Sequence, residues 1–174
     1  ADNIFLGKET LFVQKGVVNR KKMYAEAKKA MGKIGIEDIN PEDPITKYSL
    51  EERKLIEVVR ALYSDPRIFI VDETTTALSQ KGRDIIYQVI RKLKEENKTV
   101  LFISHDLEEL MEVCSKLIVL RDGVFIAELQ KEEFLEDRIK ELMVGRKLTG
   151  DYYRSDYDGS YDDEVVLKGE DIYV

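Results

Sequence analysis

The chain has 174 residues, 43% of them hydrophobic, and 28 Lys and Arg against 35 Asp and Glu give it a net charge of −7. This size and composition predict one globular domain with a real core, followed by a tail. The negative charge argues against general binding to nucleic acid or acidic lipid, and no apolar run reaches the roughly 18 residues of a membrane span.

The predicted elements alternate between helices and strands after a helical first third. Apolar residues between Met23 and Ile34 recur every three or four positions, so the first helix ends near Gly35. A second helix begins at Ser49 and stops before Pro66. The later elements are a strand at 68–71, a helix with an apolar stripe, a strand at 100–103, a helix capped by Asp106, a hairpin of strands at 117–120 and 124–129, and a helix closing near Gly145. The apolar stripe of the helix after residue 71 is formed by Ile86, Val89, Ile90 and Leu93. This alternation predicts a parallel α/β sheet.

Composition divides the chain into four segments. We expect a helical subdomain at 1–62, an α/β core at 63–147, a linker at 148–164 and the start of a following domain at 165–174. The linker holds four tyrosines among six acids between residues 149 and 164, and it has too few aliphatic residues to fold alone. The first residues of the chain look like an internal segment of a protein, so we expect the chain to be a piece of a longer one.

Two adjacent carboxylates, Asp72 and Glu73, follow the apolar run at 68–71. A buried strand places Asp72 at the carboxyl edge of the sheet, where an acid can hold Mg²⁺ through water while the metal bridges phosphate oxygens. Glu73, beside the metal rather than bound to it, can orient and deprotonate an attacking water. The alternative is a strand that ends in two solvated acids.

The only histidine of the chain, His105, follows the next predicted strand. In a parallel sheet it emerges at the same edge as Asp72 and Glu73. An imidazole in this place can donate a hydrogen bond to charge that develops on a phosphate. A solvent-facing histidine at a helix start is the alternative, and the position at the sheet edge favours the functional role.

Ser49 has two interpretations that can both hold. With Glu52 it matches the capping-box pattern, and the same helix N-terminus presents free N–H groups to an anion. The G-x-x-x-x-G-K-S/T loop that cradles a triphosphate does not occur in this sequence, since neither Gly7-Lys8-Glu9 nor Gly32-Lys33-Ile34 provides it. We therefore expect no tight nucleotide binding by this chain alone.

These motifs resemble those of the nucleotide-binding subunits of ABC transporters. The resemblance rests on the order and spacing of Val71-Asp72-Glu73, Thr75-Thr76-Ala77-Leu78-Ser79, Ile103-Ser104-His105 and Leu120-Arg121-Asp122-Gly123. Three further segments look like the first ATPase half of the tandem ribose, galactose and xylose importers: Asn3-Ile4-Phe5-Leu6-Gly7, residues 56–62 and Met143-Val144-Gly145-Arg146. The resemblance covers nearly the whole chain, as the C-terminal part of that half without the Walker A loop.

The resemblance implies an α/β fold, namely a partial P-loop NTPase core with a parallel sheet, a helical subdomain and a missing phosphate-loop strand. It implies Asp72 as the Walker B aspartate that holds the metal, Glu73 as the catalytic base and His105 as the switch histidine. Ser49, Leu50 and Glu51 stand in the signature that contacts ATP held by the opposite subunit. That signature departs from LSGGQ, because Glu51 and Glu52 bring two carboxylates beside a triphosphate and add repulsion.

The resemblance also implies ATP and Mg²⁺ as cofactors and an ATP-hydrolysing parent protein at the cytoplasmic face of the cell membrane. Its implied partners are transmembrane permease subunits, a second ATPase half or homologous subunit and, indirectly, a periplasmic or extracellular sugar-binding protein, with no nucleic acid. We expect the chain alone to be inactive.

Two alternatives to a sugar importer stay open. One is a split chromosome-maintenance or DNA-repair ATPase, and the other is a docking module without catalysis. The sequence of a split ATPase would contain sustained heptad repeats before the signature, and its surface would be basic. In the importer, the missing strand would lie between the strands at 100–103 and 117–120, and we expect residues 165–174 or a second copy to cover part of that gap.

Overall fold

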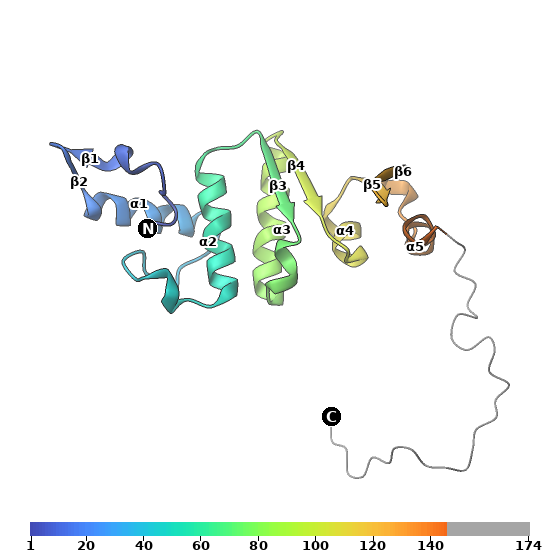
Figure 1. Cartoon of the computed structure of the whole chain (residues 1–174), viewed down its shortest axis with the longest axis horizontal. Coiled ribbons are helices and arrows are strands. Elements are labelled where there is room, and N and C mark those ends of the chain that lie inside the picture. The colour runs from blue at the N-terminus through green and yellow to red at the C-terminus, as the bar shows by residue number, and fades with distance from the viewer. Residues whose placement is uncertain (146–174) are drawn as a thin grey trace, which may run out of the picture. The chain divides into compact units, whose positions relative to one another are not determined.

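A computed structural model describes residues 1–145 of the chain (Figure 1). These residues belong to two compact units, Ala1–Leu117 and a second that begins at Ile118. The predicted linker at 148–164 and the predicted start of a following domain at 165–174 lie outside the described residues. The subdomains expected at 1–62 and 63–147 remain a proposal.

A short hairpin opens the first unit and was not predicted. After the 3₁₀ turn η1 (Glu9–Phe12), β1 (Val13–Gln14) pairs antiparallel with β2 (Val17–Val18). The two residues between the strands, Lys15 and Gly16, both have positive φ, at 50° and 81°, as the tight turns of two-residue hairpins require. The expectation of a helical first third is therefore wrong over these residues, because a lysine in the left-handed region carries no sequence signal for a turn.

Two helices form the rest of the N-terminal part. Helix α1 (Arg20–Gly32) buries Met23, Ala27, Ala30 and Met31. After the short turn η2 (Ile45–Lys47), helix α2 (Leu50–Tyr63) buries Leu55, Ile56, Val58 and Val59 in the same hydrophobic cluster. The three- and four-residue spacing of these side chains explains why each helix presents one apolar face.

Strand β3 (Ile68–Asp72), helix α3 (Gln80–Glu95) and strand β4 (Thr99–Ile103) form a parallel β-α-β unit. The register pairs Ile68 with Thr99 at one end and Asp72 with Ile103 at the other. Helix α3 lies along one face of this strand pair (Figure 1). That face joins the core through Phe69 and Val71, and the parallel pairing predicted from the sequence is confirmed.

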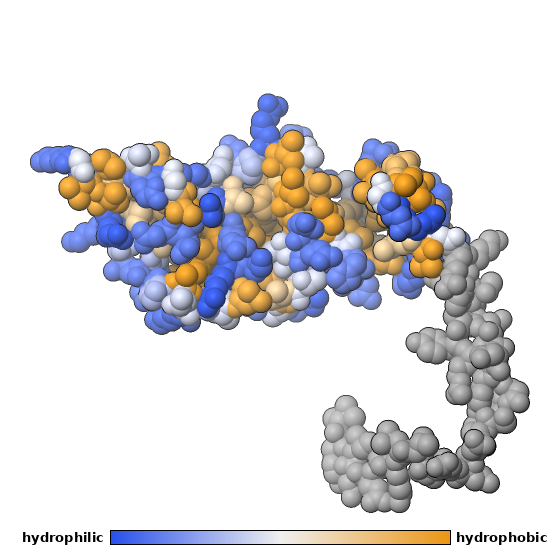
Figure 2. Space-filling view, in the orientation of Figure 1, coloured by the Kyte–Doolittle hydropathy of each residue, from blue (hydrophilic) through white to orange (hydrophobic). Residues whose placement is uncertain are grey.

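The opposite face of the same two strands is apolar and exposed. Its side chains are exposed by 64% at Ile68, 61% at Ile70, 48% at Leu101 and 42% at Ile103. Figure 2 shows apolar surface gathered where β3 and β4 lie. The expectation of a buried strand therefore holds for one face only, because no element of the unit Ala1–Leu117 covers the other.

The first unit continues into helix α4 (Leu107–Val113), and strand β5 (Lys116–Arg121) leads into the second. Strand β5 pairs with β6 (Val124–Gln130) in a sheet separate from that of β3 and β4. The turn between them has positive φ at Asp122, 52°, and Gly123, 76°, so the predicted hairpin is confirmed. The short turn η4 (Lys131–Glu133) and helix α5 (Glu136–Val144) follow, and α5 ends at Gly145 with φ 81°.

Candidate active site

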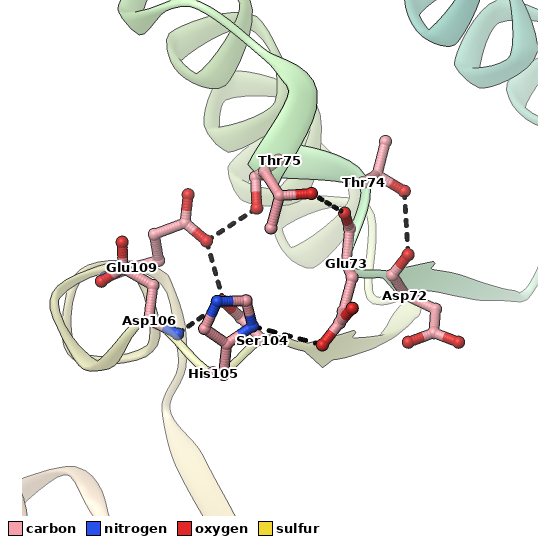
Figure 3. A network of polar contacts seen from close by, with 9 residues as sticks. Asp72, Glu73, Thr74, Thr75, Ser104, His105, Asp106 and Glu109 are labelled. Atoms are coloured by element: carbon pink, nitrogen blue, oxygen red, sulfur yellow. Dashed lines mark hydrogen bonds and ion pairs between the residues drawn. The ribbon is translucent and has the colours of Figure 1, made fainter.

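The parallel register brings Glu73 and His105 together. Asp72 is the last residue of β3 and pairs with Ile103, the last residue of β4. The N–H of Glu73 donates to the carbonyl of Ile103 at 3.0 Å. The Nδ1 of His105 lies 3.2 Å from Oε1 of Glu73 (Figure 3). The two side chains are 69% and 58% exposed, so a ligand at this edge of the sheet can reach both of them.

Glu73 occupies a left-handed backbone conformation, with φ 46° and ψ 24°. Residues other than glycine rarely adopt it, and such strain persists where surrounding contacts hold the chain. Here Thr76 Oγ1 donates to the Glu73 carbonyl at 2.8 Å. The turn takes the chain out of β3 into the 3₁₀ helix η3 (Thr74–Ala77), and Glu73 points toward His105 (Figure 3).

Asp72 lies at the exposed end of β3, next to this pair. Within residues 1–145 its carboxylate has no hydrogen bond or ion pair, while its carbonyl accepts a hydrogen bond from Thr74 Oγ1 at 3.4 Å. The same residues hold no cluster of three or more His, Cys, Asp or Glu side chains able to bind a metal. A free carboxylate fits Mg²⁺, which keeps several waters and takes one or two carboxylates together with substrate phosphates.

Ser49 caps α2, as the sequence predicts. Its Oγ accepts from the Glu52 N–H at 3.3 Å, and Glu52 Oε2 accepts from the Ser49 N–H at 2.7 Å. The second of these bonds holds the pKa of the Glu52 carboxyl below its usual value. No described contact joins Ser49 or Leu50 to the pair of Glu73 and His105, so their role toward an anion stays a prediction.

The Glu51 side chain contacts the loop that follows Glu73, so it is not unpaired at the start of α2. Its Oε1 accepts a hydrogen bond from Ser79 Oγ at 2.6 Å. Ser79 is also the N-cap of α3, where its Oγ accepts from the Gly82 N–H at 3.3 Å. The start of α2 and the loop after Glu73 are therefore linked by a direct hydrogen bond.

A buried carboxylate, that of Glu109, is linked to the segments that carry the exposed pair and was not predicted as part of the site. Glu109 in α4 is 6% exposed and accepts from the hydroxyls of Thr75 and Ser104 at 2.7 and 3.0 Å (Figure 3). The Tyr87 hydroxyl donates to its other oxygen at 2.9 Å. Burial and the hydrogen bond to this carboxylate raise the pKa of Tyr87 far above its usual value. In the sequence Glu109 looks like the second acid of a helix start, beside Glu108, and local pattern gives no sign that it is buried.

The fold is that of ATP-binding cassettes. The chain superposes on MJ1267, an ATP-binding cassette of an ABC transporter, with a TM-score of 0.63 and 23% identity over 81% of this chain and 60% of that one. A post-hydrolysis state of the cassette MJ0796 bound to ADP and Pi matches with a TM-score of 0.59 and 25% identity over 71% of this chain and 53% of that one. The expected fold class, a P-loop ATPase core of the ABC type, is confirmed.

In sequence the chain is similar to the galactose/methyl galactoside import ATP-binding protein MglA 2 of Photobacterium profundum. The two are 37% identical over 149 residues, which are 85% of this chain and 29% of that protein. The chain thus spans less than a third of the length of this relative. No protein-family model matches the chain.

Within its described part, no helix is long and apolar enough to cross a bilayer.

Proposed function

We propose that the chain is part of the ATP-hydrolysing subunit of an ABC-type monosaccharide importer, specifically the C-terminal part of its first ATPase half. The observation that carries this proposal is the 3.2 Å contact between Glu73 and His105 at the ends of two parallel strands of a cassette fold. Similarity to a galactose import protein supports the sugar as cargo.

In this proposal the exposed pair performs the hydrolytic chemistry. Glu73 accepts the proton of the attacking water as general base, and His105 donates a hydrogen bond to the charge that develops on the terminal phosphate. Asp72 would hold Mg²⁺ through water, and the bound ion would neutralise charge on the phosphate oxygens. The free carboxylate of Asp72 and the exposure of Glu73 and His105 support these roles.

The signature residues Ser49, Leu50 and Glu51 would serve a second site, where ATP is held by another ATPase half or a homologous subunit. Two carboxylates near a triphosphate would repel it. The structure offers each carboxylate an internal partner, since Glu52 is bonded to the Ser49 N–H and Glu51 to Ser79. These bonds fix the positions of the two carboxylates within the chain, while both groups keep their negative charge.

The proposal includes the partners and the location of the complete protein. Residues 1–62 would dock on transmembrane permease subunits at the cytoplasmic face of the cell membrane, and residues 63–147 would form the catalytic core. A periplasmic or extracellular sugar-binding protein would act through the permease.

The test uses the complete polypeptide that carries this chain, reconstituted with its permease in vesicles. Glu73→Gln is expected to lower kcat for ATP by about 10²- to 10⁴-fold while ATP binding is retained. The matched control is Glu95→Gln, an exposed acid in the last turn of α3 that should leave turnover unchanged. The chain alone should show no turnover, so turnover that Glu73→Gln abolishes would contradict that expectation.

The same preparation separates the proposal from its alternatives. Hydrolysis stimulated by DNA without a permease would favour the split chromosome-maintenance ATPase. A complete polypeptide without a G-x-x-x-x-G-K-S/T loop would favour the docking module.

A further inference from the structure

Glu109 is the only buried charged side chain within residues 1–145. Its Oε2 accepts from Thr75 and Ser104, and its Oε1 accepts from Tyr87. An ionised carboxylate only accepts hydrogen bonds, so three converging hydroxyl donors match its charged form. A fully satisfied polar network in the interior is rigid and sets a unique arrangement of the groups that it joins.

Two of the three donors come from the segments that carry the exposed pair. Thr75 lies two residues after Glu73, and Ser104 lies directly before His105. Both hydroxyls meet the same Oε2 atom of Glu109, as Figure 3 shows. The third donor, Tyr87, fixes the other carboxylate oxygen to α3.

Ser104 is held from two sides. Its Oγ donates to Glu109 and accepts from the Asp106 N–H at 3.0 Å, while Asp106 Oδ1 accepts from the N–H groups of Glu108 and Glu109 at the start of α4. The segment that carries His105 is thus fixed on both sides of the histidine. The contact between Glu73 and His105 is itself exposed, and an exposed contact between two polar side chains holds its own geometry weakly.

We propose that Glu109 is a positioning residue that sets the contact between Glu73 and His105 through Thr75 and Ser104. The assignment of that pair as base and switch rests on the proposed function. Glu109 does not reach the pair directly, so it acts only by holding the two backbone turns together.

The single histidine of the chain makes the test direct, because the imidazole ¹⁵N spectrum reports one residue. In the otherwise wild-type chain, Glu73→Gln changes the partner of Nδ1 and shifts the His105 signals. In a Glu109→Ala background the pair is no longer held in contact, so the shift caused by Glu73→Gln is lost. The absence of a shift in the wild-type background would overturn the proposal.

The matched control is Glu108→Ala, the exposed acid one position earlier on the same helix. Its background should leave the Glu73→Gln shift intact. Circular dichroism and urea midpoints measured on each variant report stability separately. A structural role alone would lower the midpoint of Glu109→Ala and leave the shift caused by Glu73→Gln unchanged, which would overturn the proposal.

A second variant keeps the test decisive if Glu109→Ala does not fold. Thr75→Val keeps the shape of a side chain that is 1% exposed and removes one donor to Oε2. We expect it to diminish the Glu73→Gln shift. Glu109→Gln should retain part of the shift, because its amide oxygen can accept from Thr75 and Ser104 while its NH₂ group donates to Tyr87. An undiminished shift in Thr75→Val would overturn the proposal.

None of these spectra needs nucleotide, so they stand apart from the proposed ATPase activity. A complete subunit that fails to hydrolyse ATP would contradict the proposed function and leave the positioning role standing. In an active complete subunit, Glu109→Gln should lower kcat while KM for ATP is unchanged, since no contact with nucleotide is removed. A rise in KM at constant kcat would overturn the positioning role.

Discussion

Oε1 of Glu51 accepts a hydrogen bond from Ser79 Oγ at 2.6 Å, which joins the start of α2 to the start of α3. A Cβ added at Gly82 would overlap that same Glu51 oxygen, and it would lie 3.1 Å from Cβ of Leu78. Glycine at position 82 therefore leaves the space that the Glu51 carboxylate occupies. The contact and the glycine belong to one arrangement, so changes at the two positions should not be additive.

Gly82→Ala should be close to neutral in the wild-type chain. Alanine is favoured over glycine in a helix by about 0.5 to 1 kcal/mol, but here it displaces Glu51 from Ser79. In a Glu51→Ala background the carboxylate is gone, and the same change should stabilise the chain by about 0.5 kcal/mol. Urea unfolding of the four variants in this cycle measures the difference.

The control for this cycle is Gly32→Ala at the end of α1, where nothing lies within 4 Å of an added Cβ. Its effect should be the same with and without Glu51. If the effect of Gly82→Ala is also independent of Glu51, the glycine does not make room for that side chain.

Ser49→Ala should destabilise the chain by about 1 kcal/mol, because it removes the side-chain acceptor of the capping box. Ser49→Asp keeps an acceptor at the N-cap, so thermal unfolding should return close to that of the wild type. For the complete polypeptide, the proposed function predicts that the added charge of Ser49→Asp still lowers hydrolysis, because it would repel the phosphate proposed to bind at this helix start. Recovery of both stability and hydrolysis in Ser49→Asp would show that Ser49 caps the helix and has no role at phosphate.

The capping box should also make stability depend on pH. The hydrogen bond from the Ser49 N–H lowers the pKa of Glu52 in the folded chain below its ordinary 4.5. A lowered folded pKa contributes stability that is fully present above the unfolded value and is lost as the pH falls through the folded value. Urea midpoints measured below pH 4.5 should therefore fall less steeply in Glu52→Gln than in the wild type. Equal slopes would show that this carboxylate gains no stabilisation from folding.

Local patterns in the sequence predict much of the fold. Ser49 with Glu52, and Asp106 before its helix, identify two helix starts because a cap depends on residues three positions apart. The contact between Glu73 and His105 follows from the sheet, since neighbouring parallel strands end at one edge.

Contacts between distant residues are not predicted by such patterns. Glu109 and Thr75 are 34 positions apart, and Glu51 and Ser79 are 28 positions apart. The identity of each residue fits an ordinary helix or turn, so only the packing of α2, α3 and α4 shows that they meet. The positive φ of Glu73 is likewise absent from the sequence pattern, because glutamate has no preference for that conformation.

The left-handed backbone of Glu73 predicts that glycine is more stable than alanine at position 73, which is the reverse of the order in a helix. At φ 46° a side chain costs about 1 to 2 kcal/mol, which glycine avoids, while glycine loses about 0.5 to 1 kcal/mol through its greater freedom in the unfolded chain. Glu73→Gly should therefore be more stable than Glu73→Ala by up to about 1.5 kcal/mol in urea unfolding. At Gln88, exposed in the middle of α3, alanine should instead be favoured over glycine by a similar amount. Alanine favoured at both positions would mean that the turn which aims Glu73 at His105 is not left-handed.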